Sequence, residues 1–497
     1  MTTAPAILLE DARGRRLLST ALGAVIGGLA GATLAVADSG IFPIGTSVVF
    51  GSIAVATAAL AAAVASARGA GLALGRFRLA TWYPLLFAVA FGLTSVSWRN
   101  PQSGSAALIG QKSVLTALTY AVLSLAGWTI GYLLGPGRPA RHAVATGIRR
   151  VLGAGRPALR TPKIALVLYG FGWIGRSLQL ATGRYAYLGD ASIGVVSASG
   201  FGQPIALLEL CTRFALVVAA IDVAWSRKRR SRNTLAALLI LELAVGLFGG
   251  MKSEFVLTIL GLVVVAAATE SRLPKKGMIF AFLAFTVLLG FNEQYRSQVR
   301  TSEYSLSPAQ AAPLVPRLLV ETLIHTSPRS IFIDGPQRLG ERLREIDNVA
   351  IVVQRTPSEI PYAGLRPLAE APALGVVPRV IWPSKPLLTR GYEFAQQYYD
   401  LRGLYTSSAI TPIGDLYRHA GLAALLSGMV VLGAACRLVD DELHPSVDLR
   451  LAVFFIPLFA ALMNVETDAV AALASVPLLL VQSVLVCKFA FRTVPVA

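Results

Sequence analysis

Long uncharged segments constrain the fold of this chain more than any other feature of its sequence. The segment from Ser39 to Ala67 carries no charged residue. At about 1.5 Å per residue, a helix of that length crosses the roughly 30 Å hydrocarbon core of a bilayer. Comparable segments recur to the end of the chain, only 14% of whose residues are charged, and its mean hydropathy is +0.63. The sequence therefore predicts an all-α polytopic membrane protein.

About twelve transmembrane helices are predicted. The first four form an N-terminal module, residues 1–137, and a basic linker, 138–163, separates it from spans five to nine, 164–291. A large loop, 292–419, leads to the last three spans and a short tail, 420–497. The first span is either an uncleaved anchor or, because it ends in the signal-peptidase-like Ala-Val-Ala, a cleaved signal. The predicted spans cover residues 17–37, 39–67, 79–98, 113–137, 164–181, 202–225, 234–249, 255–269, 277–291, 420–436, 451–465 and 469–487.

Basic residues are distributed unevenly between the segments that connect these spans. With both termini in the cytoplasm, the inner segments hold 25 basic and 7 acidic residues, a difference equal to the net charge of +18 for the whole chain. This asymmetry follows the positive-inside rule and predicts that the loop 292–419 lies outside the cytoplasm. The positive charge therefore reflects membrane topology, and we expect no nucleic-acid partner.

The predicted outer loop contains structural signals of its own. Leu339, Leu343, Ile346 and Ala350 recur at helical spacing, which predicts an amphipathic helix on the membrane surface or on the helix bundle. Seven prolines between residues 357 and 386 predict an extended, looping path after it. The 14 basic and 12 acidic residues of the loop also fit a folded, salt-bridged cap.

The sequence lacks the usual signatures of nucleotide and metal chemistry. It contains no Gly-rich nucleotide loop, no arrangement typical of a Ser-His-Asp triad and no outer aspartate pair. Asp440, Asp441 and Glu442 are clustered, but the topology predicts a solvated cytoplasmic helix end there. We therefore expect neither a metal nor a cofactor. The three cysteines have neither paired nor metal-ligand spacing: Cys211, Cys436 and Cys487.

Cations at the predicted outer face or within the bundle are the remaining candidates for a binding site. Guanidinium groups present a fixed fork of donors to phosphate oxygens, so this set suits a diphosphate. Arg176 is the strongest candidate because charge inside a span is costly and usually functional, although a structural ion pair also explains it. Arg213 is weaker because Glu209 precedes it by one helical turn, and interfacial snorkelling explains Lys252 equally well. The set comprises Arg176, Arg213, Lys252, Arg379, Lys385, Arg390 and Arg418.

Several short motifs resemble one family of membrane enzymes. PRVIWPSKP, Pro378 to Pro386, is followed about thirty residues later by GDLYRHAG, Gly414 to Gly421, which leads into a span. These motifs resemble the signature of bacterial O-antigen polymerases, the oligosaccharide repeat-unit polymerases. PYAGLRPLAEAPALGVVPR, Pro361 to Arg379, and the hairpin GGMKSEF also resemble that family. The resemblance covers spans five to twelve, and the sequence departs from the family pattern at Tyr-Arg-His after Asp415.

The resemblance implies a GT-C-like membrane glycosyltransferase of the bacterial inner membrane. Its substrate would be a polyprenyl-diphosphate-linked oligosaccharide, and its partners would be membrane lipid and a chain-length regulator or other polysaccharide-assembly proteins. Cations would stabilise the departing diphosphate, with Arg176 and Arg379 holding it from two sides. Asp415 and His419, four residues apart, are the candidate catalytic base, although helix capping and an interfacial histidine explain them as well. The candidate sugar-stacking residues, which membrane-interface anchoring also explains, are Trp382, Tyr392, Tyr398, Tyr399 and Tyr417.

Two alternative functions remain open at this point. A polysaccharide ligase would displace the same lipid diphosphate, so the sequence does not separate it from a polymerase. A transporter or flippase for lipid-linked oligosaccharides would line a path with Arg176, Glu209 and Glu242. No internal repeat of the kind common in transporters is evident, and a loop of about 120 residues favours an enzyme.

Overall fold

The computed structural model confirms a mostly helical membrane protein. In the part of the chain that it describes, eight helices are long and apolar enough to cross a membrane. Two shorter apolar helices, Ile26–Ala35 and Leu449–Met463, accompany them. The described residues are 26–35, 37, 40–69, 77–98, 108–183, 185, 202–250, 259, 262–265, 291, 294–296, 298–299, 306–325, 343–386, 390–401 and 408–494.

Most predicted spans coincide with observed helices. The fifth, sixth and twelfth spans agree with α6, α8 and α20 to within three residues at each end. Of the predicted eighth and ninth spans, only residues 259, 262–265 and 291 are among the described residues. The long apolar helices are α2 (Ile44–Gly69), α3 (Leu79–Phe87) with its continuations η1 (Ala88–Gly92) and η2 (Leu93–Ser97), α4 (Gln111–Leu134), α6 (Ile164–Ala181), α8 (Gly202–Ser226), α9 (Arg229–Gly249), α18 (Pro412–Glu442) and α20 (Ala469–Ala490).

The predicted basic linker is not purely helical. It forms the amphipathic helix α5 (Arg138–Leu152) and a short strand, β1 (Arg156–Leu159), which pairs antiparallel with β2 (Phe491–Val494) at the C-terminal end. The described chain is mostly helical, consistent with the predicted all-α membrane protein, and this short strand pair is an addition that the sequence did not predict. Local sequence did not indicate the strand because its partner lies more than 300 residues away, and two glycines with positive φ, Gly153 and Gly155, turn the chain into it.

The segment predicted as an outer loop contains several short helices. The predicted amphipathic helix begins only at Ile346, so Arg344 and Glu345 precede it, while Leu339 lies outside the described residues. The extended path predicted from the prolines is wrong for residues 366–376, which form helix α16 with Pro367 in its first turn, where a missing amide hydrogen is tolerated, and Pro372 in its interior. The helices of this segment are α12 (Pro308–Ala311), α13 (Leu314–His325), α15 (Ile346–Arg355), α16 (Arg366–Val376) and α17 (Arg390–Tyr398).

The tenth span begins earlier than predicted and is broken. Helix α18 starts at Pro412 rather than at Ala420, so the preceding loop ends at Thr411. Ala420 (φ −157°, ψ 38°) and Gly421 (φ 68°, ψ −153°) are not helical and divide α18 into a short and a long helix. Glycine suits this break because a positive φ strains other residues.

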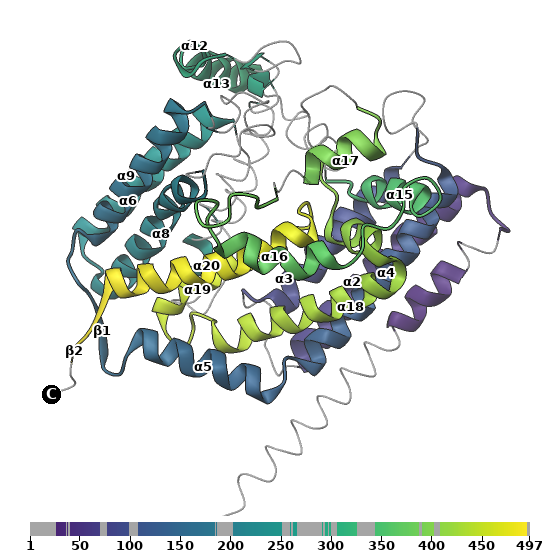
Figure 1. Cartoon of the computed structure of the whole chain (residues 1–497), viewed down its shortest axis with the longest axis horizontal. Helices are drawn as coiled ribbons and strands as arrows, with labels where there is room; N and C mark the ends of the chain where they lie inside the picture. Colours follow the sequence, from purple (N-terminus) through teal and green to yellow (C-terminus); the bar gives the residue numbers. More distant parts are fainter. Residues whose placement is uncertain are drawn as a thin grey trace, which may run out of the picture.

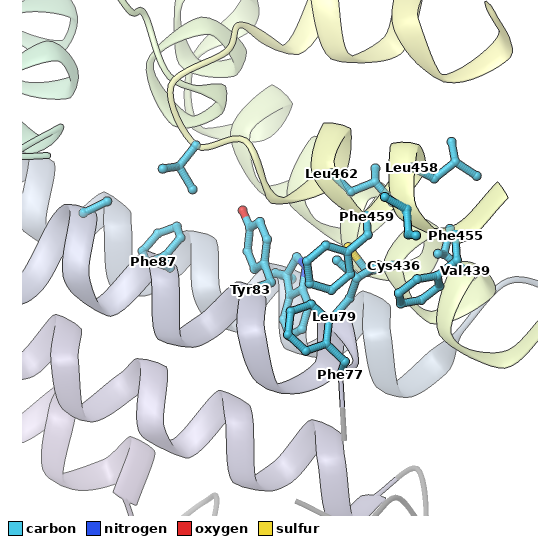
Figure 2. Packing of buried hydrophobic residues seen from close by; sticks show 14 of the residues in the cluster. Phe77, Leu79, Tyr83, Phe87, Cys436, Val439, Phe455, Leu458, Phe459 and Leu462 are labelled. Atoms are coloured by element: carbon cyan, nitrogen blue, oxygen red, sulfur yellow. The ribbon is translucent and has the colours of Figure 1, made fainter. Parts of the chain in front are cut away.

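Aromatic and aliphatic side chains of three helices form the centre of the main core. Figure 2 shows Tyr83 of α3 next to Cys436 of α18 and Phe459 of α19 (Ala452–Met463), with Phe87 farther along α3. Phe77, which precedes α3, stacks obliquely on Phe459 with ring centroids 5.2 Å apart. The N-terminal module therefore packs directly on the C-terminal spans, although nearly 400 residues separate them in sequence.

Small residues bring α4 and α18 into close contact. A Cβ atom on Gly131 would overlap the carbonyl oxygen of Val430, and one on Gly433 would overlap the carbonyl oxygen of Trp128. Glycines commonly permit such backbone approach between membrane helices, where dispersion contacts drive association. In Figure 1, α5 and the two strands lie along one side of the bundle, with α15 and α17 on the opposite side.

We predict that Gly131→Ala destabilises the protein because its methyl group forces α4 away from α18. Overpacking of this kind costs about 1–3 kcal/mol, which should appear as a lower unfolding temperature in detergent micelles. Gly170→Ala on α6 is the matched control, since nothing lies within 4 Å of its Cβ position. Equal unfolding temperatures for the two variants would contradict the close packing.

Candidate functional site

Three ionisable side chains are buried together in the short first part of α18. Asp415, Arg418 and His419 share one face because they are three and four residues apart, and each is no more than 3% exposed. Thr411 begins this helix: its hydroxyl accepts a hydrogen bond from the Gly414 amide at 3.1 Å. The expectation that Asp415 and His419 lie on one helical face is thus confirmed.

Asp415 joins two helices. Its Oδ1 accepts from an Arg418 guanidinium nitrogen at 2.9 Å, and its Oδ2 accepts from the amides of Ala469 and Val470 at 3.0 and 3.3 Å. These amides begin α20 and have no partner within their own helix. Asp415 is therefore a helix cap, as the alternative interpretation held, but it caps α20, while Thr411 caps α18.

The surroundings of His419 fix which of its ring nitrogens is basic. Its Nδ1 lies 2.6 Å from the Gly364 carbonyl oxygen, and because a carbonyl only accepts, Nδ1 must carry the proton. Its Nε2 lies 3.6 Å from Asp415 Oδ1 and has no hydrogen-bond partner within the described chain. Nε2 is therefore the ring nitrogen that faces the Asp415 carboxylate.

The loop before α16 repairs the break in α18. The amides of Ala363 and Gly364 donate to the carbonyls of Arg418 and His419, both at 3.0 Å. At membrane depth, unpaired carbonyls are costly unless protein groups satisfy them. Tyr362 lies against Gly421, whose added Cβ would be 2.9 Å from the tyrosine oxygen. The same loop thus closes the broken helix and positions His419.

The aromatic candidates are distributed over several packed surfaces. Tyr417 lies between the rings of Tyr120 and Tyr362, with centroids 5.2 and 6.3 Å away. Trp382 is half-buried, and its indole nitrogen donates to the Ser384 hydroxyl at 3.2 Å. Tyr392 is half-buried on α17.

Tyr398 and Tyr399 occupy core positions rather than the predicted sugar or interface positions. Both are buried, and their hydroxyls lie 2.6 Å from the Thr356 hydroxyl and 2.7 Å from the Asn348 amide oxygen. Burial raises the pKa of both hydroxyls. Their hydroxyls therefore satisfy buried polar partners, as buried tyrosines commonly do.

Arg379 and Lys385 organise the PRVIWPSKP segment through neutral partners. Arg379 donates to the carbonyls of Pro383, Lys385 and Pro386. The buried Lys385 ammonium donates to Gln203 on α8 and to the Val377 carbonyl, both at 3.0 Å. Burial and, secondarily, the charge of Arg379 lower the pKa of Lys385. Within the described residues no carboxylate contacts either cation.

Arg176 has a different environment, inside the bundle between α6, α8 and α9. Its two terminal nitrogens contact the carboxylate of Glu242 in a bidentate pair, and Glu209 lies 3.8 Å away. Tyr169 and Thr212 also donate to Glu242, at 3.0 and 3.4 Å. These contacts match the structural ion pair that was the alternative explanation of Arg176 from the sequence. A role for Arg176 in substrate binding stays a prediction.

Some candidates lie apart from this site. Lys252 lies outside the described residues, and of Arg390 only its position at the start of α17 is described. The prediction that Asp440 belongs to a solvated helix end is wrong. Asp440 is fully buried and caps α3 by accepting hydrogen bonds from the Leu79 and Ala80 amides at 2.9 Å. Asp441 and Glu442 are partly buried and pair with Arg437 and Arg141.

The sequence interpretation missed Gly364 and Thr411 as site residues. Thr411-Pro412 is a helix-start signal, an N-cap residue followed by proline at the first helical position, and it could have placed Asp415 and His419 inside α18. No local signal identified Gly364, because its role depends on a contact with His419, 55 residues away.

We predict that the Arg176–Glu242 pair is structural. Arg176→Leu leaves a buried carboxylate without its cation and should destabilise the protein by about 3–5 kcal/mol, whereas Arg176→Leu combined with Glu242→Leu should cost clearly less than the sum of the single changes. Unfolding temperatures in detergent micelles measure the stability of the single and the double variants. Leu178→Ala, at an exposed position on α6, is the control. If Arg176→Leu is as stable as the parent protein, the cation is not needed for folding, and this result would favour its predicted role in binding the substrate diphosphate.

Comparison with known proteins identifies one related family. The family model described as "Domain of unknown function (DUF8712)" matches residues 184–467, more than half of the chain. Neither curated proteins nor solved structures gave a match. The matched region contains α8, α9, the segment with α15 to α17, and the buried cluster of α18.

Proposed function

This chain belongs to the DUF8712 family, and from the geometry of the α18 site we propose that it is a membrane glycosyltransferase that polymerises polyprenyl-diphosphate-linked oligosaccharides. One observation carries the proposal: His419 Nε2 is a buried ring nitrogen 3.6 Å from the Asp415 carboxylate. Buried, paired titratable groups of this kind are typical of sites that move protons. The motifs that resemble those of O-antigen polymerases suggest the substrate class.

The proposed reaction transfers one proton, forms the new glycosidic bond and breaks the bond between the donor sugar and the lipid diphosphate. The hydroxyl of the acceptor sugar gives its proton to His419 Nε2 while its oxygen attacks the anomeric carbon of the donor. The bond from that carbon to the lipid diphosphate breaks, and the electron pair leaves with the diphosphate. Asp415 stabilises the imidazolium, and the Gly364 carbonyl holds the ring in the required orientation.

Cations around α18 would stabilise the departing diphosphate. Arg418 retains a guanidinium nitrogen, Nε, with no partner in the described part of the chain. Arg379 and Lys385 keep their net charge because carbonyl and amide oxygens orient them without neutralising them. Lys385 contacts the first turn of α8, and Trp382 packs against the cluster that holds Val470 of α20. The PRVIWPSKP segment therefore packs near the start of α20, whose first amides Asp415 accepts from.

We further propose twelve spans in a bacterial inner membrane, with both termini cytoplasmic and the segment before α18 outside. Supporting this, segments with a predicted inner location lie together: Arg141 of α5 contacts Glu442 at the end of α18, and β1 pairs with β2 near the C-terminal end. The segments with a predicted outer location, α15 and α17, lie on the opposite side in Figure 1.

We predict that His419→Gln lowers the rate of polymer formation by about two to four orders of magnitude, because glutamine can still donate to Gly364 but cannot take the proton. Polysaccharide from cells that lack the chromosomal copy, separated by gel electrophoresis, gives the readout. His142→Gln on the exposed face of α5 is the control. Matched membrane levels and unfolding temperatures exclude misfolding.

The outcome of this experiment also separates the alternatives. Full-length polymer at the normal rate from a folded His419→Gln protein would remove His419 from the proposed reaction. A parent protein that transfers preformed polymer without extending it would indicate a ligase. Movement of lipid-linked oligosaccharide across the membrane without glycosidic bond formation would indicate a flippase.

Single cysteines test the proposed orientation. We expect Ser358→Cys, exposed after α15, to react with a membrane-impermeant maleimide in intact cells, and Ala143→Cys, exposed on α5, to react only after permeabilisation. The parent protein provides the background from its own cysteines, two of which are buried. The reverse pattern would place the α18 site on the cytoplasmic side and exclude transfer at the outer leaflet of the membrane.

A further inference from the structure

An exposed apolar strip runs along α16 and into the segment that follows it. One side of α16 exposes Ala369, Pro372, Ala373 and Val376, and the strip continues into the following segment. Val380 and Ile381 there are 63% and 74% exposed. The charge on this side is confined to the beginning of the helix, where Arg366 pairs with Glu370 at 2.7 Å. Contiguous apolar surface of this kind marks an interaction site.

Both ends of α16 contact helices that are long and apolar enough to cross a membrane. Just before its start, Gly364 bonds to the His419 backbone, which lies roughly 10 Å along the axis from the start of α18 at about 1.5 Å per residue. Near its end, Gly375 packs so closely that an added Cβ would overlap the carbonyl oxygen of Ala474. Ala474 lies roughly 7 Å into α20, on the same scale.

The buried side of α16 is the side that faces the bundle. Ala371 and Leu374 pack in one cluster with Val470 and Ala474 of α20. The opposite, apolar side therefore faces away from the bundle. Leu473, beside Ala474, is a partly exposed apolar residue of α20, a helix long and apolar enough to cross a membrane. The strip thus lies near an exposed apolar position of a candidate span rather than forming an isolated patch.

We propose that α16 and residues 377–381 form a membrane-inserted element whose strip contacts the acyl chains of the leaflet in which α18 and α20 begin. If the strip faced water, its apolar side chains would be hydrated, which is unfavourable in free energy. Contact with acyl chains removes this cost. The charged pair Arg366–Glu370 then lies at the headgroup end, and Arg379 and Lys385 lie on the inner side of the element. This inference does not depend on the proposed glycosyl transfer.

Nitroxide labels on single cysteines in lipid nanodiscs test the proposal. Ala373→Cys and Ile381→Cys report on the strip, Ile174→Cys on the exposed face of α6 is the lipid reference, and Ser358→Cys is the water reference. Oxygen concentrates in hydrocarbon and a nickel chelate stays in water. We expect accessibility to oxygen to exceed accessibility to the chelate several-fold at residues 373, 381 and 174, with the reverse at 358.

Each other outcome overturns the proposal. Chelate accessibility at residues 373 and 381 equal to that at 358 means that the strip faces water. Labels that reach neither reagent but broaden each other's spectra mean that a second copy of the chain covers the strip. Labels that reach neither reagent and show no broadening mean that the strip is buried within one chain. Two label positions are used so that one perturbed variant does not decide the result.

Discussion

The structure depends on buried carboxylates of α18 that cap other helices. Asp440 accepts from the first amides of α3, and Asp415 accepts from the first amides of α20. The first amides of a helix have no intrahelical partner, and within a membrane water cannot satisfy them. The positive end of each helix dipole also favours a carboxylate there. One helix therefore fixes the N-terminal module at one end and the last span at the other.

The break in α18 connects this architecture with the chemistry of the site. Ending the helix at Ala420 and Gly421 frees the carbonyls of Arg418 and His419, and the loop at Ala363 and Gly364 satisfies them. The carbonyl of Gly364 also accepts from His419 Nδ1. The loop that stabilises the broken backbone therefore also orients the candidate base. The position of His419 thus depends on the same contacts that hold the break in α18.

The cations of this protein differ in what surrounds them. Glu242 neutralises Arg176 inside the bundle, in a pair that Tyr169 and Thr212 complete. Carbonyl and amide oxygens hold Arg379 and Lys385, and these orient the groups without cancelling their charge. An anionic ligand gains more from Arg379 and Lys385 than from Arg176, because at Arg176 the ligand would compete with the buried carboxylate of Glu242.

The sequence by itself determined the membrane class, the bounds of α6, α8 and α20, and the shared face of Asp415 and His419, because apolarity over some twenty residues and helical spacing are local properties. It also identified the cationic PRVIWPSKP segment. Only the tertiary structure decided that Asp440 is a buried cap, that Arg176 pairs with Glu242, that β1 pairs with β2 and that Gly364 orients His419. Each of these depends on two groups that lie between 55 and more than 300 residues apart. No window along the chain contains both partners, so the pairing becomes fixed only when the helices pack.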